Sequence, residues 1–246
     1  MKADPKVQLR LLAMQGHDAA LARLEHRRRT LRQLAAISAA DARLAQLRDE
    51  LVRAETEVGD LDRELRRLDG DVDQVRRRSE RDQQRMQSGA VAAKELESLQ
   101  HEVQSLARRQ SDLEDVQLEL MEKREDAESR AAAVRGEVAT VTAGRQAAVE
   151  ARDSAYAGID AEAAADAAAR ESLAIELPAD LLALYEKVRA TSGGVGAAEL
   201  RQRRCEGCRL EMFGAELRAI RAAAPDDVLR CENCRRILVR TAESGL

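Results

Sequence analysis

Residues 84–99 read Gln-Arg-Met-Gln-Ser-Gly-Ala-Val-Ala-Ala-Lys-Glu-Leu-Glu-Ser-Leu, and Gly89 in this stretch separates two long apolar repeats. Before the glycine, positions spaced alternately by three and four residues from Leu44 to Met86 are apolar at eleven of thirteen places. After it, the same spacing from Leu96 to Ile159 is apolar at fourteen of nineteen places, against 44% in the whole chain. Repeats of this period are typical of supercoiled helices. Because glycine readily adopts φ > 0 and ends helices, the sequence predicts an antiparallel coiled-coil hairpin with its tip near residues 87–92.

Irregularities in the repeats refine this prediction. The first arm, from about residue 6 to residue 88, contains apolar residues spaced by three at Leu31, Leu34 and Ile37, which marks a stutter. A dimer of two long parallel helices would present similar repeats, but the central break favours the hairpin. Polar seam residues lower stability and can fix register. They interrupt one sub-position of the second repeat, at Gln110, Gln117, Arg124, Arg145 and Arg152.

The composition fits long helices better than a large globule. The chain has no Trp, one Phe and two Tyr, and 35% of its residues are charged, so little core per residue is expected. The net charge of −4 argues against a chain-wide nucleic-acid surface. No apolar run approaches the ~18 residues that a membrane span needs. We expect a cytoplasmic protein, and the Ala and Arg bias suggests a bacterial one.

A neck and a small terminal domain follow the hairpin. Leu177-Pro178 suits the start of a new helix ending near Thr191, in which we interpret Tyr185 as a packing residue. Residues 192–196 are rich in glycine and predict a flexible link. The sequence therefore predicts a hairpin over 1–175, a neck over 176–198 and a terminal domain over 199–246.

The terminal domain contains all four cysteines, in two C-x-x-C pairs: Cys205, Cys208, Cys231 and Cys234. Two such pairs supply the four thiolates of a tetrahedral zinc site, whereas a redox C-x-x-C usually occurs singly in a βαβ unit. We expect a four-cysteine zinc ribbon with one structural Zn²⁺, a helix over 215–223 and strands over 228–230 and 237–239. Gly207 and Asn233 precede the second cysteine of each pair, and both tolerate a left-handed backbone.

Catalytic motifs are not found in the sequence. The three histidines fall on expected helices, and there is no Ser-His-acid set, glycine-rich phosphate loop or HExxH motif. A zinc ion with four protein ligands has no open position for water. We therefore expect no enzyme and no small-molecule substrate.

Two kinds of macromolecular partner fit the sequence. Arginines flank both cysteine pairs, and the candidate nucleic-acid contacts are Arg203, Arg204, Arg209, Arg235 and Arg236. Only Phe213 could stack on a base. We expect an adaptor, monomeric or dimeric, whose hairpin binds protein and whose ribbon binds protein or nucleic acid. The alternative is a regulatory protein that binds DNA or RNA through its ribbon.

A family resemblance rests on four segments taken together. They are Cys205-Glu-Gly-Cys208, Cys231-Glu-Asn-Cys234-Arg-Arg-Ile-Leu238, Leu184-Tyr-Glu-Lys-Val-Arg189 and the tip segment Lys94-Glu-Leu-Glu-Ser-Leu-Gln-His-Glu102. The chain resembles bacterial C4-type zinc-ribbon proteins with an N-terminal coiled coil, a family catalogued as a domain of unknown function. The resemblance implies a hairpin-plus-ribbon fold without known catalysis. Some relatives are linked to an alternative sigma factor, secretion components or flagellin mRNA. The family usually has Gly after the last cysteine, where this chain has Arg235.

Overall fold

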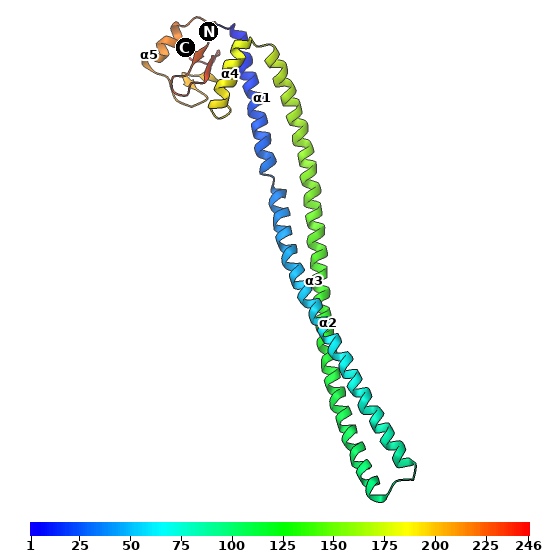
Figure 1. The fold of residues 1–246 in the computed structure, drawn as a ribbon. Coiled ribbons are helices and arrows are strands. Elements are labelled where there is room, and N and C mark those ends of the chain that lie inside the picture. The colour runs from blue at the N-terminus through cyan, green and yellow to red at the C-terminus, as the bar shows by residue number, and fades with distance from the viewer. The chain divides into compact units, whose positions relative to one another are not determined.

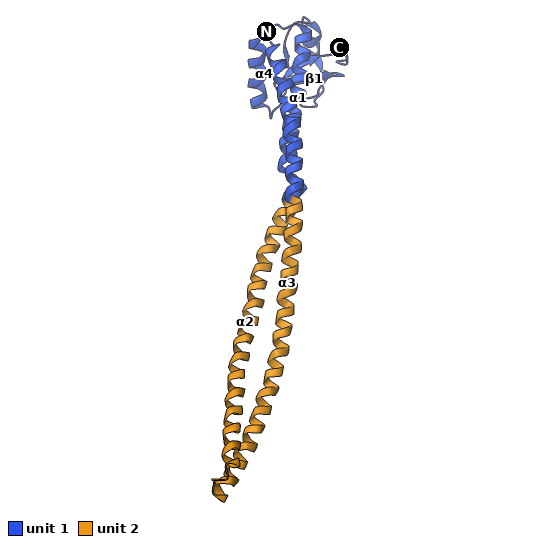
Figure 2. Cartoon of the chain, turned by 90° about the vertical axis from the view of Figure 1, so that its right-hand side faces the viewer, with its two compact units in different colours: residues 1–34, 149–246 blue, residues 35–148 orange.

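The structure is a computed structural model that describes residues 1–246. Its elements follow the chain as helices α1 (Pro5–Arg29), α2 (Arg32–Gln87), α3 (Ala93–Ile175) and α4 (Ala179–Thr191), then strands β1 (Ala197–Arg201) and β2 (Arg204–Cys205), helix α5 (Gly214–Ala222), and strands β3 (Leu229–Arg230) and β4 (Ile237–Arg240) (Figure 1). The chain forms two compact units, residues 35–148 and residues 1–34 with 149–246 (Figure 2). The fold is a long helical hairpin followed by a small strand-containing ribbon, which confirms the predicted fold class.

Residues 35–148 form the tip-proximal part of the hairpin. Helix α2 ends at Gln87, α3 begins at Ala93, and Gly89 between them has φ of 69°. The turn thus lies between these two helices, and ion pairs such as Arg85–Glu95 and Arg43–Glu137 join the two arms. A buried cluster of Leu68, Val72, Leu113 and Leu120 lies in the seam.

Three of the five polar residues that interrupt the second repeat bond to carboxylates of the opposite arm. Gln117 donates to Asp69 at 2.5 Å, Arg124 to Asp62 at 2.8 Å, and Arg145 to Asp41 at 2.5 Å. Each step from one donor to the next matches an equal step in the opposite direction between the acceptors, as antiparallel pairing requires. These three bonds fit a role of polar seam residues in specifying the register.

The first arm is not one helix. Helix α1 ends at Arg29, with the Thr30 hydroxyl and N–H both bonded to the carbonyl of His26, and α2 begins at Arg32. The break at Thr30–Leu31 lies where the stutter in the apolar spacing begins. Because Leu31, Leu34 and Ile37 are spaced by three, a continuous helix would rotate them off the seam. The interruption allows the chain to change register instead.

In residues 1–34 and 149–246, a four-stranded sheet has the order β2-β1-β4-β3. Strand β1 pairs in parallel with β4, and the two outer pairs are antiparallel. Alternation along the central strands gives the sheet two apolar faces. Ala197, Ile237 and Val239 join a core with α1 and α4, while Ala198 and Leu238 join a core around the cysteines.

The core that the sheet forms with α1 and α4 contains a buried polar network. The Tyr185 hydroxyl donates to Asp18 Oδ2 at 2.5 Å and lies 3.1 Å from Gln15 Oε1. Asp18 also pairs with Arg170 and Arg189 although its side chain is only 1% exposed. The buried hydroxyl has its pKa raised by burial and by the neighbouring Asp18. Tyr185 packs in the core, as the sequence indicated, and it also connects α4 to α1.

The segment predicted as a flexible link is anchored to this core. Gly196 N–H donates to Gln15 Oε1 at 2.7 Å, and the Gly194 carbonyl accepts from the same side chain. A Cβ at Gly196 would lie 2.7 Å from the Tyr185 ring, so only glycine fits there. The first residues also join the ribbon, where Ala3 N–H donates to Asp226 and Val228 N–H donates to Met1. The domain boundaries given above stay a prediction, because helices and ribbon share this core.

Candidate metal centre

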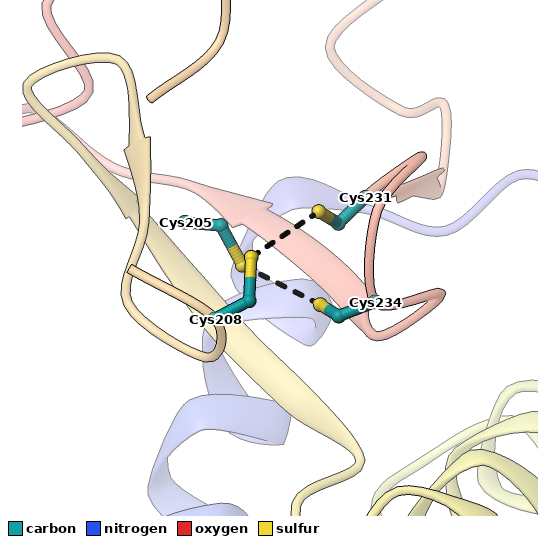
Figure 3. Close-up of side chains that lie close together, drawn as sticks. All are labelled: Cys205, Cys208, Cys231 and Cys234. Atoms are coloured by element: carbon teal, nitrogen blue, oxygen red, sulfur yellow. Dashed lines mark hydrogen bonds between the residues drawn. The ribbon is translucent and has the colours of Figure 1, made fainter. Parts of the chain in front are cut away.

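Two loops bring the four cysteine sulfurs together. Cys205 ends β2, Cys231 directly follows β3, and the second cysteine of each pair lies three residues further along (Figure 3). The sulfurs all lie within 4.8 Å of one another, and Cys205–Cys234 and Cys208–Cys231 have Sγ–Sγ distances of 3.8 Å. In a tetrahedron with Zn–S bonds of ~2.3 Å, two sulfurs are about 3.8 Å apart. The donor set therefore fits one tetrahedral zinc ion.

The two cysteine loops have the same backbone hydrogen bonds. The residue after each second cysteine donates its N–H to the carbonyl of the first, from Arg209 to Cys205 at 2.6 Å and from Arg235 to Cys231 at 2.9 Å. The first cysteine in turn donates to the carbonyl five residues on, at Leu210 and at Arg236. The sequence thus forms the same metal-binding turn twice.

The left-handed residue of each turn differs from the expectation. Arg209 has φ of 60° and Arg235 has φ of 63°, whereas Gly207 and Asn233 do not have positive φ. The expected left-handed backbone at Gly207 and Asn233 is therefore wrong. The chain reverses to close the turn one residue after the second cysteine, so the left-handed residue lies there. Gly207 is needed for close approach instead. A Cβ there would lie 2.7 Å from Arg236 Cδ and 3.0 Å from Ala198 Cβ.

Burial shapes the electrostatics of the sulfur cluster. Burial raises the pKa of the Cys205 and Cys231 thiols above the ordinary value. At Cys234 burial also acts to raise the pKa, but hydrogen bonds, the backbone bond from Arg236 foremost, outweigh it and lower the pKa. Without a cation the buried sulfurs at Cys205 and Cys231 favour the neutral thiol. A bound Zn²⁺ would supply the charge that stabilises four thiolates.

Arg236 ties the second cysteine turn to its surroundings. Its guanidinium donates to the carbonyls of Ser192, Val195 and Gly207, at 2.7, 3.2 and 3.1 Å. One side chain thus joins the second cysteine turn to the first and to the segment after α4. This role was not foreseen from the sequence, because it depends on carbonyls far away in the chain.

The other arginines expected to contact nucleic acid have different surroundings. The Arg203 side chain donates to the Gly245 carbonyl, while Arg204, Arg209 and Arg235 are exposed and their guanidinium groups make no hydrogen bond or ion pair. From the sequence, Phe213 was considered only as a stacking surface for a base, and Leu210 near it was not identified. Leu210 is 52% exposed and Phe213, the one phenylalanine, is 68% exposed. The signal in the sequence that could have pointed to these two residues is the scarcity of large apolar residues in the chain.

Comparison with known proteins supports the same architecture. Residues 14–193 match the model of the CT398-like coiled coil hairpin domain, and residues 204–238 match the C4-type zinc ribbon domain. This chain belongs to the CT398-like coiled-coil hairpin family. The family's C4-type ribbon and the four clustered cysteines are consistent with one structural zinc ion. The resemblance inferred from the sequence is confirmed.

Relatives in this family extend over nearly the whole chain. A Mycobacterium tuberculosis protein is 39% identical over 98% of both chains, and a Mycobacterium leprae protein is 31% identical over 87% of this chain and 91% of its own. A solved structure from Mycobacterium smegmatis has 36% identity and a TM-score of 0.86, covering 98% of this chain and 100% of that one. The structure of CT398 from Chlamydia trachomatis, with 17% identity and a TM-score of 0.66 over 96% and 98% of the two chains, shares the fold.

The matching families describe a coiled coil and a zinc ribbon, and neither is a catalytic family. None of the helices has an apolar stretch of the length and composition needed to cross a membrane.

Proposed function

We propose that this protein is a non-enzymatic adaptor that docks protein partners through its hairpin and its ribbon. In this proposal Cys205, Cys208, Cys231 and Cys234 hold one zinc ion and complete its coordination. Four sulfurs leave no position for water or substrate, so the ion stabilises the ribbon and performs no Lewis-acid chemistry.

The observation that carries the proposal is a pair of exposed large apolar side chains beside the metal site. Leu210 and Phe213 flank Met212, which is buried in the cysteine-side core. Met212 is thus buried in the ribbon, while Leu210 and Phe213, which lie on either side of it in the sequence, are exposed. Exposed large apolar side chains next to a rigid turn are typical of protein contacts. The hairpin likewise exposes Leu118 to 60% and Met121 to 44%.

Nucleic-acid binding through the ribbon is the less favoured alternative. Arg236 uses its guanidinium on three backbone carbonyls, and Arg203 bonds to Gly245, so two of the five candidate arginines have structural partners. Phe213 stands without a second aromatic residue in the ribbon. The arginines that remain exposed, Arg204, Arg209 and Arg235, fit acidic groups on a protein partner equally well.

The adaptor proposal is tested by affinity capture with the full zinc-loaded chain. Wild type is compared with a Leu210→Ser/Phe213→Ser variant and with a control, Ile175→Ser, which alters a side chain that is 81% exposed outside the ribbon. We expect specific proteins to be lost with the double variant and retained with the control. Capture of the same proteins by all three chains would contradict docking at this surface.

The alternative is tested separately by filter binding of RNA and duplex DNA at rising salt. Counterion release predicts a steep fall in affinity with salt if the ribbon contacts phosphates. We expect only weak binding that does not change when Arg204 and Arg235 are replaced by Glu. Tight binding lost in that variant would favour the nucleic-acid function.

A further inference from the structure

Helix α3 carries a concentrated negative segment. Residues 112–128 contain two basic residues, Lys123 and Arg124, and eight acidic ones, which are Asp112, Glu114, Asp115, Glu119, Glu122, Glu125, Asp126 and Glu128. This short segment is more negative than the whole chain, whose net charge is −4. The same segment contains Leu118 and Met121, two of the exposed large apolar residues of the hairpin.

The apolar and acidic side chains are ordered on the helix surface. Glu114, Leu118, Met121 and Glu125 follow one another by four, three and four residues, so they form one stripe along one side of α3. Two apolar residues occupy the middle of the stripe and a carboxylate stands at each end. No other element of residues 35–148 covers Leu118, which is 60% exposed.

A groove between the arms borders this stripe. It is lined by Leu65 and Asp69 of α2 and by Gln117, Met121, Arg124 and Glu125 of α3. Arg124 is the one base in the lining, and its guanidinium pairs with Asp62 and Glu128 at 2.8 Å. Asp69 and Gln117 bond to each other across the seam. Arg124 is thus already occupied by carboxylates, and the groove keeps an excess of negative charge.

We infer that this groove and stripe bind a cationic amphipathic helix of a partner protein, which lies along α3 as a third helix. Its apolar face would cover Leu118, Met121 and Leu65, while Lys or Arg residues on its flanks would face Glu114, Glu125 and Asp69. The apolar face and the flanking cations of the partner helix both follow from the surface of α3, because an apolar strip between carboxylates is complementary to an apolar strip between cations. The inference rests on the proposed adaptor function and specifies the partner class for the hairpin.

The probe is a designed helical peptide with Leu at three- and four-residue spacing and Lys on both flanks. Its control has the same apolar face and Glu in place of Lys. Fluorescence anisotropy with the full zinc-loaded chain should detect the cationic peptide and not the acidic one. Replacing Glu114 and Glu125 by Lys should weaken binding of the cationic peptide about tenfold, since two attractive contacts become repulsive.

A matched variant separates the groove from general electrostatics. Glu119→Lys/Asp126→Lys produces the same change in net charge on residues that the helical repeat places away from the stripe. We expect this control to change affinity less than twofold. A second variant, Leu118→Ser/Met121→Ser, should weaken binding and leave the unfolding transition unchanged, because both side chains are exposed.

Several outcomes would overturn the inference. They are no binding of the cationic peptide by wild type, equal losses in the two lysine variants, or self-association of the chain that only the stripe variants abolish, which would make a second copy the occupant. If the peptide fails while capture through Leu210 and Phe213 succeeds, only the groove inference falls and the adaptor proposal stands.

Discussion

At the residue scale, the backbone at Arg235 is the least expected feature of the metal site. Arg235 has φ of 63°, and the family resemblance places Gly at this position. A left-handed conformation costs a residue with a Cβ ~1–2 kcal/mol. The hydrogen bond from Arg235 N–H to the Cys231 carbonyl shows why the turn nevertheless adopts it.

Arg235→Gly should therefore stabilise the zinc-loaded protein. We expect a gain of about 0.5–1 kcal/mol in the free energy of unfolding, since relief of the left-handed strain is partly offset by the added freedom of the unfolded chain. Urea titration with excess zinc measures it. Asn233→Gly is the control, because Asn233 does not have positive φ, and an equal gain in both variants would contradict the assignment.

Tyr185 offers a second test at this scale. Its hydroxyl donates to Asp18, a carboxylate whose side chain is 1% exposed. Removing a hydrogen bond to a buried charged group costs ~1.5–3 kcal/mol, so Tyr185→Phe should lower the free energy of unfolding by that amount. Tyr156→Phe is the control, because this substitution removes a hydroxyl but keeps the ring, which lies under Arg28 at 4.5 Å from the guanidinium carbon. A loss at Tyr185 no larger than at Tyr156 would exclude the network as a stabilising element.

At the element scale, neighbouring side chains of strand β4 belong to two different cores, one on each face of the sheet. Ile237 and Val239 point to α1 and α4, while Leu238 points to the cysteine-side core with Met212 and Ile220. Only the second core contains cysteines, so we expect only this core to depend on zinc for its closure. Metal removal should therefore affect the two faces of the sheet differently.

Alanine substitution on the two faces distinguishes them. Ile237→Ala and Leu238→Ala should each cost ~2–5 kcal/mol in the zinc-loaded protein, because both side chains are no more than 1% exposed. After chelation the cost of Leu238→Ala should largely disappear, while that of Ile237→Ala should persist. Hydrogen exchange of amides in α1 and α4, with and without chelator, reports the helix side. Equal effects of chelation on both variants would show that the two cores are one.

At the scale of the whole molecule, the sequence predicted the parts better than their connections. The repeats from Leu44 to Met86 and Gly89 were sufficient for the hairpin, since a coiled-coil seam and its turn depend on local spacing. The two cysteine pairs were sufficient for the zinc site for the same reason. Each of these signals lies within a short stretch of sequence and can be interpreted without knowing which distant residues that stretch contacts.

The features that the sequence did not predict depend on distant contacts. Leu11 and Met14 precede the regular repeat, and their partners Ile237 and Val239 lie more than two hundred residues later. The roles of Gln15 and Arg236 likewise depend on carbonyls and N–H groups that only folding brings near. Spacing along the chain contains no information on such pairs, so the anchored link and the shared core could not be foreseen.

The most direct test of the closed four-cysteine zinc site is zinc analysis combined with X-ray absorption on the purified chain. We predict one zinc ion per chain, with four sulfur neighbours at ~2.3 Å and no nitrogen or oxygen ligand. Substoichiometric zinc in protein purified without chelator, or a first shell containing oxygen or nitrogen, would contradict a closed structural site.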